Sequence, residues 1–345
     1  MDLDRLEQIL GRFPEVSLAV VGDFFLDKYL VIDRQLSEVS IETGLEAFQV
    51  VDIRHSPGAA GTVCNNLAAL GVGRLYAVGL TGADGQGYEL RQGLAARGVL
   101  LDYLREYPDF FTPTYTKPME LQPDGSEVEM NRVDIKNRRF LNPKAEAEMI
   151  LCLREAAQRV KGMLIADQVT EEGYGVVTPG MREALVSVAA DNPRLDILVD
   201  SRARVAEFRG LMLKPNHHEA EQALTGGHPD VRIDPHQAGQ GLSRRSGKPV
   251  FVTRGEEGML VCTGDACTTV PGVPVEGPLD IVGAGDSASA GIMMALASGA
   301  SLAEASVVGN LVASITVQQL GTTGTATVAQ VRERFRQHAT RWESI

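Results

Sequence analysis

The segment Asp280-Ile-Val-Gly-Ala-Gly-Asp-Ser-Ala-Ser-Ala-Gly291 indicates the fold more clearly than any other part of this chain. Its glycine-alanine-glycine turn, residues 283–285, leads directly into a pattern of small residues that predicts a helix over 285–298. Glycines let the backbone turn tightly and direct successive N–H groups to one point, and a helix N-terminus adds a partial positive charge. The segment therefore predicts an anion-binding turn at the start of a helix, which suits phosphate groups.

The carboxylate of Asp286, at the mouth of this turn, has two interpretations. Beside a bound phosphate it would only repel, unless it accepts the proton of a hydroxyl that attacks the phosphate. The alternative is an ordinary helix N-cap next to a tight turn. These residues alone leave both open, so the choice depends on the rest of the chain.

Short apolar runs alternate with helical patterns along most of the sequence. Strands are predicted at residues 17–22, 75–80, 163–166, 196–200, 211–214 and 249–253. Helices are predicted at residues 1–13, 63–70, 88–97, 181–190, from 216 onward, and at 285–298, 302–319 and 327–338. This order predicts an α/β fold, a doubly wound and mostly parallel sheet with helices on both faces. Ligands of such folds bind beyond the carboxyl ends of the strands, where we find Gly22, Asp23, Asp200, Asn216, Thr253 and Gly255.

Two segments, at about residues 28–54 and 112–135, lack a helical period and contain alternating stretches. They predict extra antiparallel strands inserted into a single domain over residues 1–345. A small sheet beside the strand ends is expected to act as a lid, and the alternative is an edge hairpin that only covers the core. Exposed strands of this kind invite pairing with a second copy, so we expect a homodimer formed through the lid.

Composition narrows the classes of partner. The chain has 345 residues and a formal net charge of −12, which argues against nucleic acid. No apolar run approaches the ~20 residues of a membrane span, and the amphipathic start does not have the pattern of a signal peptide. The cysteines form no CxxC pair and no zinc-ligand spacing, so we expect four free thiols and a reducing, cytoplasmic location. They are Cys64, Cys152, Cys262 and Cys267.

Four motifs in a fixed order resemble the ribokinase/PfkB carbohydrate kinase family. They are Lys214-Pro-Asn-His-His-Glu219, Val252-Thr-Arg-Gly-Glu-Glu-Gly258, the turn Gly283-Ala-Gly-Asp286, and Gly321-Thr-Thr323. The resemblance implies a ribokinase-like fold and an ATP-dependent phosphotransferase that acts on a sugar hydroxyl. It assigns the anion hole to the amides of Gly283, Ala284 and Gly285 and the role of base to Asp286. A dinucleotide oxidoreductase would need GxGxxG after the first strand, which is absent.

The resemblance also assigns residues to the nucleotide-binding side of the site. It implies that ATP contacts come from Asn216, Thr253, Gly255, Gly258, Asn310, Gly321, Lys214 and Arg202. It places Mg²⁺ near Glu219 and a monovalent cation, K⁺, near Asp280. From the residues alone, the alternatives are a helix-capping pair for Asn216 and Glu219 and a solvated strand end for Lys214.

The substrate half begins with Val20-Val-Gly-Asp-Phe-Phe-Leu-Asp-Lys-Tyr29. Asp23 and Asp27 are candidate ligands of sugar hydroxyls or, alternatively, turn aspartates. Ser56-Pro-Gly-Ala-Ala-Gly-Thr-Val-Cys-Asn-Asn66 resembles the family's glycine-glycine signature, with Ala59 in place of the second glycine and Thr62 in place of the usual asparagine. The resemblance therefore adds Gly58, Ala59, Thr62 and Asn66 to the substrate site, and the alternative is a closely packed helix start.

Within the family the chain most resembles the heptose-7-phosphate kinase branch. The likeness rests on Leu80-Thr-Gly-Ala-Asp84, Pro113-Thr-Tyr-Thr-Lys117 and Met130-Asn-Arg-Val-Asp134, and the nucleotidyl-transfer domain fused to some of its members is not expected here. A substrate that already carries a phosphate calls for nearby cations, for which the candidates are Lys117, Arg132, Arg138 and Arg202. The alternatives are a ribose, fructose, sugar-acid or nucleoside kinase of the same family, and a non-catalytic binding protein on this fold.

Overall fold

A nine-stranded sheet forms the centre of the computed structural model, which describes residues 1–228, 231–321 and 323–345. Its strands are β1 (Ser17–Gly22), β6 (Arg74–Gly82), β7 (Leu100–Tyr107), β11 (Gly162–Asp167), β12 (Asp196–Ser201), β13 (Met212–Leu213), β14 (Val250–Thr253), β15 (Met259–Thr263) and β16 (Ala266–Val270). They lie in the order β16-β15-β14-β13-β12-β11-β1-β6-β7. The seven strands from β14 to β7 run parallel to their neighbours, and only β15 and β16 are antiparallel. The expected mostly parallel sheet is confirmed.

Helices cover both faces of this sheet. One face packs against α1 (Leu3–Gly11), α2 (Ala60–Ala69), α3 (Gly85–Ala95), α8 (Ala284–Ala297), α9 (Leu302–Thr316) and α10 (Val328–His338). The other packs against α4 (Pro143–Ala157), α5 (Pro179–Asp191), α6 (His217–Thr225) and α7 (Pro235–Ser246). Alternate residues of β1 face the two cores, Leu18 and Val20 on one side and Ala19 and Val21 on the other. In the described part of the chain, no helix has both the length and the apolar character of a membrane span.

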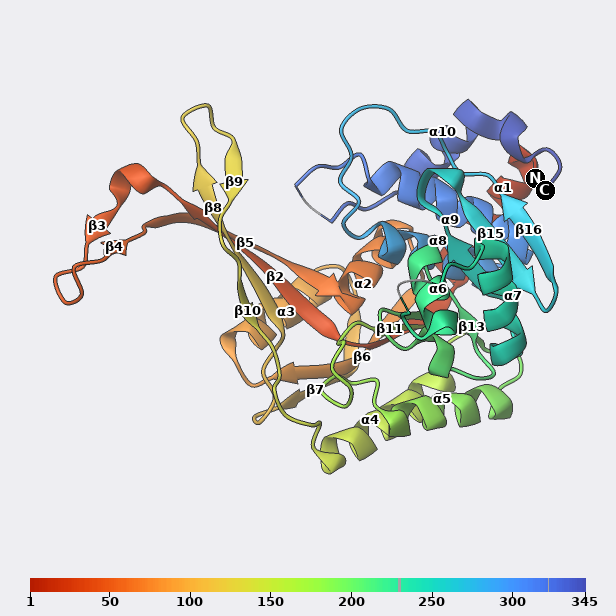
Figure 1. Ribbon diagram of the computed structural model, residues 1–345, viewed down its shortest axis with the longest axis horizontal. Helices are drawn as coiled ribbons and strands as arrows, with labels where there is room; N and C mark the ends of the chain where they lie inside the picture. Colours follow the sequence, from red (N-terminus) through yellow and green to blue (C-terminus); the bar gives the residue numbers. More distant parts are fainter. Residues whose placement is uncertain (229–230, 322) are drawn as a thin grey trace.

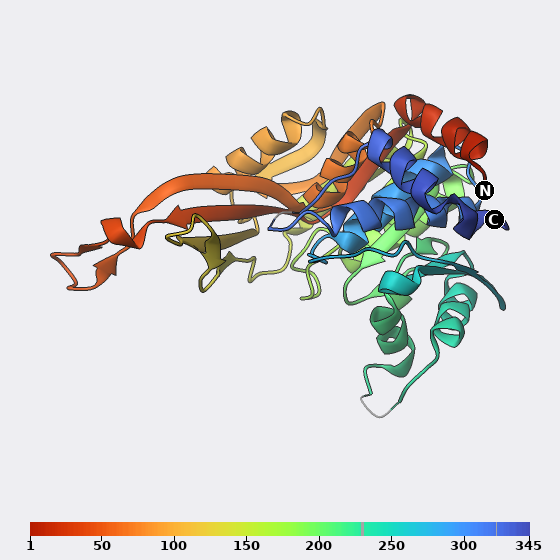
Figure 2. The ribbon, with the colours of Figure 1, turned by 90° about the horizontal axis from the view of Figure 1, so that it is seen from above.

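A second sheet projects from the main body as an arm (Figures 1 and 2). Its strands are β2 (Phe24–Ile32), β5 (Val50–Ala59), β8 (Thr114–Leu121), β9 (Glu127–Glu129) and β10 (Val133–Ile135). They lie in the order β10-β8-β2-β5, with β9 paired to β8. A two-stranded hairpin, β3 (Glu38–Val39) and β4 (Glu46–Ala47), lies at the far end of the arm. The strands of the arm therefore come largely from the two segments that lacked a helical period. Antiparallel pairing was expected for them, but β2 and β8 run parallel to each other.

Gly22 is where the chain passes from the main sheet into the arm. Its φ of 140° lies in the region that favours glycine, and a Cβ atom there would meet the carbonyl oxygen of Ala166 at 2.1 Å. The next residue, Asp23, donates its N–H to the same carbonyl at 3.1 Å. This close approach positions the first residues of β2 directly above the carboxyl ends of β1 and β11.

The cysteines correct one expectation. Cys262 and Cys267 are directly opposed on β15 and β16 and form a disulfide, whereas Cys64 and Cys152 are buried free thiols. The expectation of four thiols was wrong for this pair, because an antiparallel hairpin places two cysteines five positions apart directly across from each other. The sequence reading included neither β15 nor β16, and so it did not find this hairpin.

Candidate active site

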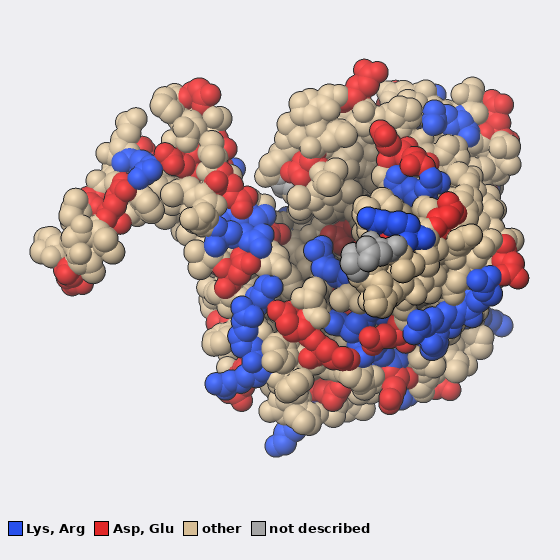
Figure 3. Space-filling view, in the orientation of Figure 1, with Lys and Arg blue, Asp and Glu red and all other residues tan. Residues whose placement is uncertain are grey.

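Two cavities adjoin at the carboxyl ends of the strands. The arm-side cavity, of about 460 Å³, lies between the arm and the main body, and the helix-side cavity, of about 670 Å³, lies beside α6, α8 and α9. Five residues line both, namely Gln168, Arg202, Val282, Gly283 and Asp286. In Figure 3 the molecule is hollowed between the arm and the body, and Lys and Arg side chains gather at the edge of the hollow. The two cavities are therefore halves of one cleft, and Asp286 lies where they meet.

The glycine-rich turn begins helix α8. Gly283 is the N-cap of this helix, with a φ of 78° that favours glycine, and no side chain caps the first turn. The N–H of Ala284 donates to the carbonyl of Ile281 at 3.2 Å, and the N–H groups of Gly285 and Asp286 are left for a ligand at the positive end of the helix. Asp286 is the third residue of the helix and not its cap, so the alternative interpretation of Asp286 as an ordinary N-cap was wrong.

The environment of Asp286 raises the pKa of its carboxyl group to about 7. Burial is the largest cause, and the nearby carboxylate of Asp200 adds to it, while Lys214 and Arg202 act in the opposite direction. A carboxyl group with a pKa near neutrality is suited to accept a proton and to release it again. Asp286 therefore has the acidity expected of a general base.

Lys214 lies beneath the glycine-rich turn and is buried. Its Nζ is 2.9 Å from a carboxylate oxygen of Asp200, which also accepts a hydrogen bond from the Ser289 hydroxyl at 2.9 Å. Burial acts to lower the pKa of Lys214, but Asp200 and Glu219 outweigh burial and raise it, so the ammonium keeps its charge. Lys214 lines the helix-side cavity and adds a fixed positive charge to its floor. The interpretation as a solvated strand end was wrong.

Asn216 and Glu219 form a reciprocal capping box at the start of α6 and also line the helix-side cavity. The Asn216 side chain accepts the N–H of Glu219 at 2.9 Å, and the Glu219 carboxylate accepts the N–H of Asn216 at 2.8 Å. Only Oε2 of Glu219 takes part in that bond. The helix-cap interpretation is therefore confirmed, and the role in binding Mg²⁺ stays a prediction for two residues that also line the cavity. Among the described residues no group of three or more His, Cys, Asp or Glu side chains could hold a metal ion by itself.

The remaining residues assigned to the nucleotide side divide into two groups. Thr253, Gly255 and Asn310 line the helix-side cavity, and the Asn310 amide donates to the carbonyl of Pro271 at 3.2 Å. In contrast, Gly258 and Gly321 are described residues that line neither cavity. Gly258 has a φ of 93° and packs against the backbone of Gly272, so it shapes the wall from behind. Thr322 of the Gly321-Thr-Thr323 motif lies outside the described residues, and Thr323 lines the arm-side cavity.

Asp280 also lies outside both cavities as the described residues define them. Its two carboxylate oxygens accept the N–H groups of Val282 at 3.0 Å and Gly321 at 3.3 Å. The carboxylate thus joins two loops beside the cleft. Each carboxylate oxygen keeps a second lone pair beside its main-chain donor, so a monovalent cation near Asp280 stays a prediction.

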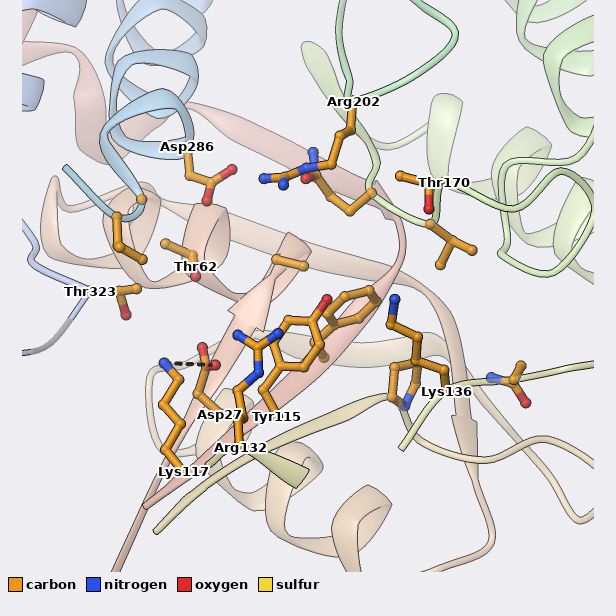
Figure 4. A pocket seen from close by; sticks show the side chains of 18 of the residues that line it. Asp27, Thr62, Tyr115, Lys117, Arg132, Lys136, Thr170, Arg202, Asp286 and Thr323 are labelled. Atoms are coloured by element: carbon orange, nitrogen blue, oxygen red, sulfur yellow. Dashed lines mark ion pairs between the residues drawn. The ribbon is translucent and has the colours of Figure 1, made fainter. Parts of the chain in front are cut away.

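The arm supplies charged and aromatic side chains to the arm-side cavity (Figure 4). Asp27 on β2 lies 3.5 Å from the ammonium of Lys117 on β8. The guanidinium of Arg132 lies 4.3 Å from the ring centre of Tyr115 and also pairs with Asp134 at 2.7 Å. Burial raises the pKa of Asp27, and Lys117 acts against this shift. Asp27 therefore faces the cavity from the side opposite Asp286, with a cation beside it.

Ala59, where the family signature has glycine, lines the same cavity at the start of α2. Its φ of 53° and ψ of −117° make it the only non-glycine residue with positive φ in the described chain. Such a conformation strains any residue with a Cβ atom. Thr62 lies one turn further along α2, and its methyl group would lie 3.4 Å from a Cβ atom at Gly283. Ala59 and Thr62 therefore narrow the cavity beside the glycine-rich turn.

Replacing Ala59 with glycine is expected to stabilise the protein. Relief of strain is worth about 1–3 kcal/mol, and the extra backbone entropy of glycine costs about 0.5–1 kcal/mol, so a net gain of about 1 kcal/mol is expected. Urea unfolding of Ala59→Gly measures it. Ala68→Gly, in the same helix but with ordinary helical geometry, should lose about 1 kcal/mol instead. A loss of stability in Ala59→Gly would show that the positive φ is not strained.

Three residues assigned to the substrate do not line the cavity. The buried carboxylate of Asp23 accepts the N–H groups of Gln168 at 2.9 Å, Val169 at 3.0 Å and Val176 at 2.7 Å, so it holds the loop after β11 instead of a ligand. Asn66 is fully buried and donates to the carbonyl of Thr62 at 3.1 Å. Gly58 lies behind Asp27, where a Cβ atom would meet the Asp27 carboxylate at 2.5 Å. Their contribution is to shape the cavity from behind.

The cavity contains residues that sequence reasoning missed. They are Phe25, Tyr115, Glu129, Lys136, Asn137, Gln168, Thr170, Glu171 and Tyr174. The group from Gln168 to Tyr174 follows the carboxyl end of β11, and that position was the available signal. Tyr115 and Lys136 come from the segment at 112–135 and just beyond it, where strand alternation indicated a sheet but not which side chains face the cleft.

Comparisons with known proteins agree on one family. Bifunctional protein HldE of Azorhizobium caulinodans is 32% identical over 320 residues, and that of Trichlorobacter lovleyi is 30% identical over 339 residues. The matches cover 91% and 96% of this chain but 63% and 65% of those proteins, so the chain spans less than two thirds of the length of these curated relatives.

Solved structures show the same fold. Ribokinase of Arabidopsis thaliana, in complex with ribose and ATP, is 20% identical with a TM-score of 0.66 and covers 93% of this chain and 99% of its own. Phosphofructokinase-2 of Escherichia coli, in complex with fructose-6-phosphate, is 18% identical with a TM-score of 0.67 and covers 94% and 99%. The fold is therefore ribokinase-like, as expected. The family model of pfkB family carbohydrate kinases matches residues 27–328, and the chain accordingly belongs to the pfkB family of carbohydrate kinases.

Proposed function

We propose that this protein transfers the γ-phosphate of ATP to a hydroxyl of a sugar phosphate, with a heptose 7-phosphate as the first candidate. The observation that carries the proposal is the position of Asp286, which lines both halves of the cleft at the start of α8. ATP occupies the helix-side cavity and the sugar occupies the arm-side cavity. The attacking hydroxyl then lies next to Asp286.

The proposed reaction uses residues already placed. The N–H groups at the start of α8 and the buried ammonium of Lys214 bind the terminal phosphates of ATP. Asp286 accepts the hydroxyl proton while the new P–O bond forms and the bond to ADP breaks. The arm acts as a lid, which excludes water and so limits hydrolysis of ATP. Asp27, across the cavity, accepts hydrogen bonds from other hydroxyls of the sugar.

A phosphorylated sugar is favoured by the cations of the arm-side cavity. Lys117, Arg132, Lys136 and Arg202 line it, in a protein whose net charge is −12. Lys117 and Arg132 pair with carboxylates, whereas Lys136 forms no ion pair within the described residues. A local group of cations attracts an anion even on an acidic protein. Lys136, which lines the arm-side cavity only, is proposed as the main ligand of the sugar's own phosphate.

Magnesium is proposed at Glu219. Its Oε1 is not engaged in the capping box and Glu219 lines the helix-side cavity, so one carboxylate oxygen is available. Mg²⁺ usually keeps several waters and is held by one or two carboxylates together with substrate phosphates. The ion would neutralise charge on the phosphates. K⁺ is proposed near Asp280, and no step of the reaction is assigned to it.

The test is a screen for ADP release over phosphorylated and free sugars, with thermal shift measured in parallel. Turnover with a sugar 7-phosphate, and none with the same sugar unphosphorylated, is the expected result. Turnover only with ribose, fructose, a sugar acid or a nucleoside would support the kinase activity but show that the proposed substrate is wrong. No ADP release with any acceptor, despite binding of ATP, would favour a non-catalytic binding protein instead.

The pKa of Asp286 predicts the pH dependence of kcat/KM. The carboxyl group must be deprotonated to accept a proton, and burial raises its pKa to about 7. Since kcat/KM reports the free enzyme, it should fall about tenfold per pH unit below 7 and level off above it. A profile that is flat between pH 5 and 8 would contradict the role of Asp286 as base. Urea unfolding at each pH serves as the control for loss of the folded protein.

A homodimer in the cytoplasm, the compartment that supplies ATP, completes the proposal. The arm exposes a row of large apolar side chains that include Val39, Ile41 and Leu45, which are 71%, 102% and 69% exposed. Apolar surface of this extent is typical of an interface, and a second copy of the arm would cover it. Sedimentation of the protein should give a dimer that Ile41→Glu converts to a monomer. A wild-type monomer at micromolar concentration would rule the dimer out.

A further inference from the structure

We infer that Arg202 is a catalytic residue whose guanidinium group binds the phosphoryl group while it passes from ATP to the acceptor. The inference rests on the proposed kinase function and adds a residue that acts in the transition state. Arg202 is one of the five residues that line both cavities. Figure 4 shows its side chain extending toward Asp286 from the opposite wall. A phosphoryl group in transit passes between these two side chains.

The backbone of Arg202 is held firmly. Its N–H donates to the carbonyl of Asp167 at 3.0 Å. Two nearby residues are anchored to the carboxylate of that same aspartate, the preceding Ser201 through its hydroxyl at 2.5 Å and Arg204, two positions on, through an ion pair at 2.6 Å. The base of the Arg202 side chain therefore has a fixed position at the end of β12, and only its long side chain remains to adapt to a ligand.

The guanidinium group of Arg202 has no partner of its own. It makes no ion pair and no side-chain hydrogen bond with any of the residues that the structure describes. The other cations near the cleft differ. Lys214 is paired with Asp200 at 2.9 Å, Lys117 with Asp27 at 3.5 Å, and Arg132 with Asp134 at 2.7 Å. Lys136 is also unpaired within the described chain, but it lines only the arm-side cavity.

The chemistry of the transfer calls for such a group. As the acceptor oxygen bonds to the γ-phosphorus and the bond to ADP breaks, negative charge is spread over the three equatorial oxygens of the phosphoryl group. A guanidinium group can donate two parallel hydrogen bonds to those oxygens. Both cations lower the pKa of Asp286, but Arg202 lines both cavities, whereas Lys214 lines only the helix-side cavity. Arg202 therefore reaches the group in the middle of its path.

The test separates transition-state binding from simple binding of ATP or of the sugar's phosphate. Arg202→Gln should lower kcat by about 10²–10³-fold while the KM values for ATP and for the sugar change by less than about fivefold. Arg202→Lys, which keeps the charge but not the paired hydrogen bonds, should lie between Arg202→Gln and the wild type. Arg244→Gln, in an exposed pair on the surface, is the control and should keep the wild-type kcat.

A second measurement uses the sugar that the acceptor screen identifies. In the wild type, ADP with aluminium fluoride and the sugar should give a melting temperature well above that measured with ADP and the sugar alone. Arg202→Gln should lose this additional rise in melting temperature. It should keep the rise that ATP alone causes. A wild-type kcat in Arg202→Gln, or an effect confined to KM, would overturn the inference. An inactive wild type would instead count against the proposed function. If Arg202→Gln fails to fold, the kcat of Arg202→Lys decides: a wild-type value overturns the inference and a lowered value with unchanged KM supports it.

Discussion

Asp286→Asn should lower kcat by about 10³-fold or more and leave ATP binding intact. Asparagine has nearly the same shape as aspartate but cannot accept the proton of the attacking hydroxyl, and a general base contributes about 10²–10⁴-fold to a rate. The dissociation constant for ATP should stay the same or fall, because the substitution removes a negative charge from beside the phosphates. Steady-state ADP release and isothermal titration with ATP measure the two quantities separately.

The matched control is Asp265→Asn. Asp265 lies in the turn between β15 and β16, and its side chain is exposed, so its loss should not alter kcat. If Asp286→Asn kept a kcat within a few fold of the wild type, the base would have to be another group. Asp27, which also lines the arm-side cavity, would be the next carboxylate to test.

Breaking the ion pair between Asp167 and Arg204 should cost about 3–5 kcal/mol of unfolding free energy. Both side chains are buried. The Arg204 guanidinium lies 2.6 Å from the Asp167 carboxylate and donates to the carbonyl of Thr170 at 2.8 Å. Arg204→Met leaves the carboxylate of Asp167 buried with only the Ser201 hydroxyl as a polar side-chain partner. Urea unfolding at neutral pH measures the loss. Thr170 lines the arm-side cavity, so the KM for the sugar should rise as well.

The control is the same substitution in an exposed pair. Arg244→Met removes the partner of Asp265, where both side chains are mostly exposed, and should cost less than about 1 kcal/mol. The pH dependence gives a further check. Burial already raises the pKa of Asp167, and loss of Arg204 raises it more, so the folded variant takes up a proton as the pH falls. The deficit of Arg204→Met should therefore shrink toward acid pH. Equal losses in the two variants would show that the buried pair has no special role.

The central sheet could be predicted from the sequence because its strands are short apolar runs that end at glycine or at polar residues. Ser17–Gly22 is almost wholly buried and reads as a parallel strand without ambiguity. The antiparallel edge was not predicted, since Met259–Thr263 and Ala266–Val270 are short strands separated only by a two-residue turn. The disulfide between Cys262 and Cys267 follows from the pairing register of these two strands, which cannot be derived from the sequence alone.

The part of the site that could be predicted is the part formed by one continuous motif. The turn at 283–286 supplies a glycine, a helix start and a carboxylate, and these stand together in space because they are adjacent in the chain. The substrate side was harder, because the lining of the arm-side cavity comes from many segments that are far apart in the sequence. Asp23 and Asp27 are four residues apart at the start of the arm, yet one clamps a loop and the other faces the cavity. Only the direction of each side chain separates these roles.

A crystal structure with a non-hydrolysable ATP analogue and the sugar identified by the acceptor screen would test the central claim most directly. We expect the γ-phosphate at the free N–H groups at the start of α8 and the acceptor hydroxyl within about 3 Å of the Asp286 carboxylate. Sugar and nucleotide would then fill the arm-side and helix-side cavities, respectively. An acceptor hydroxyl that lies beyond hydrogen-bonding reach of Asp286, with another group beside it, would contradict the account.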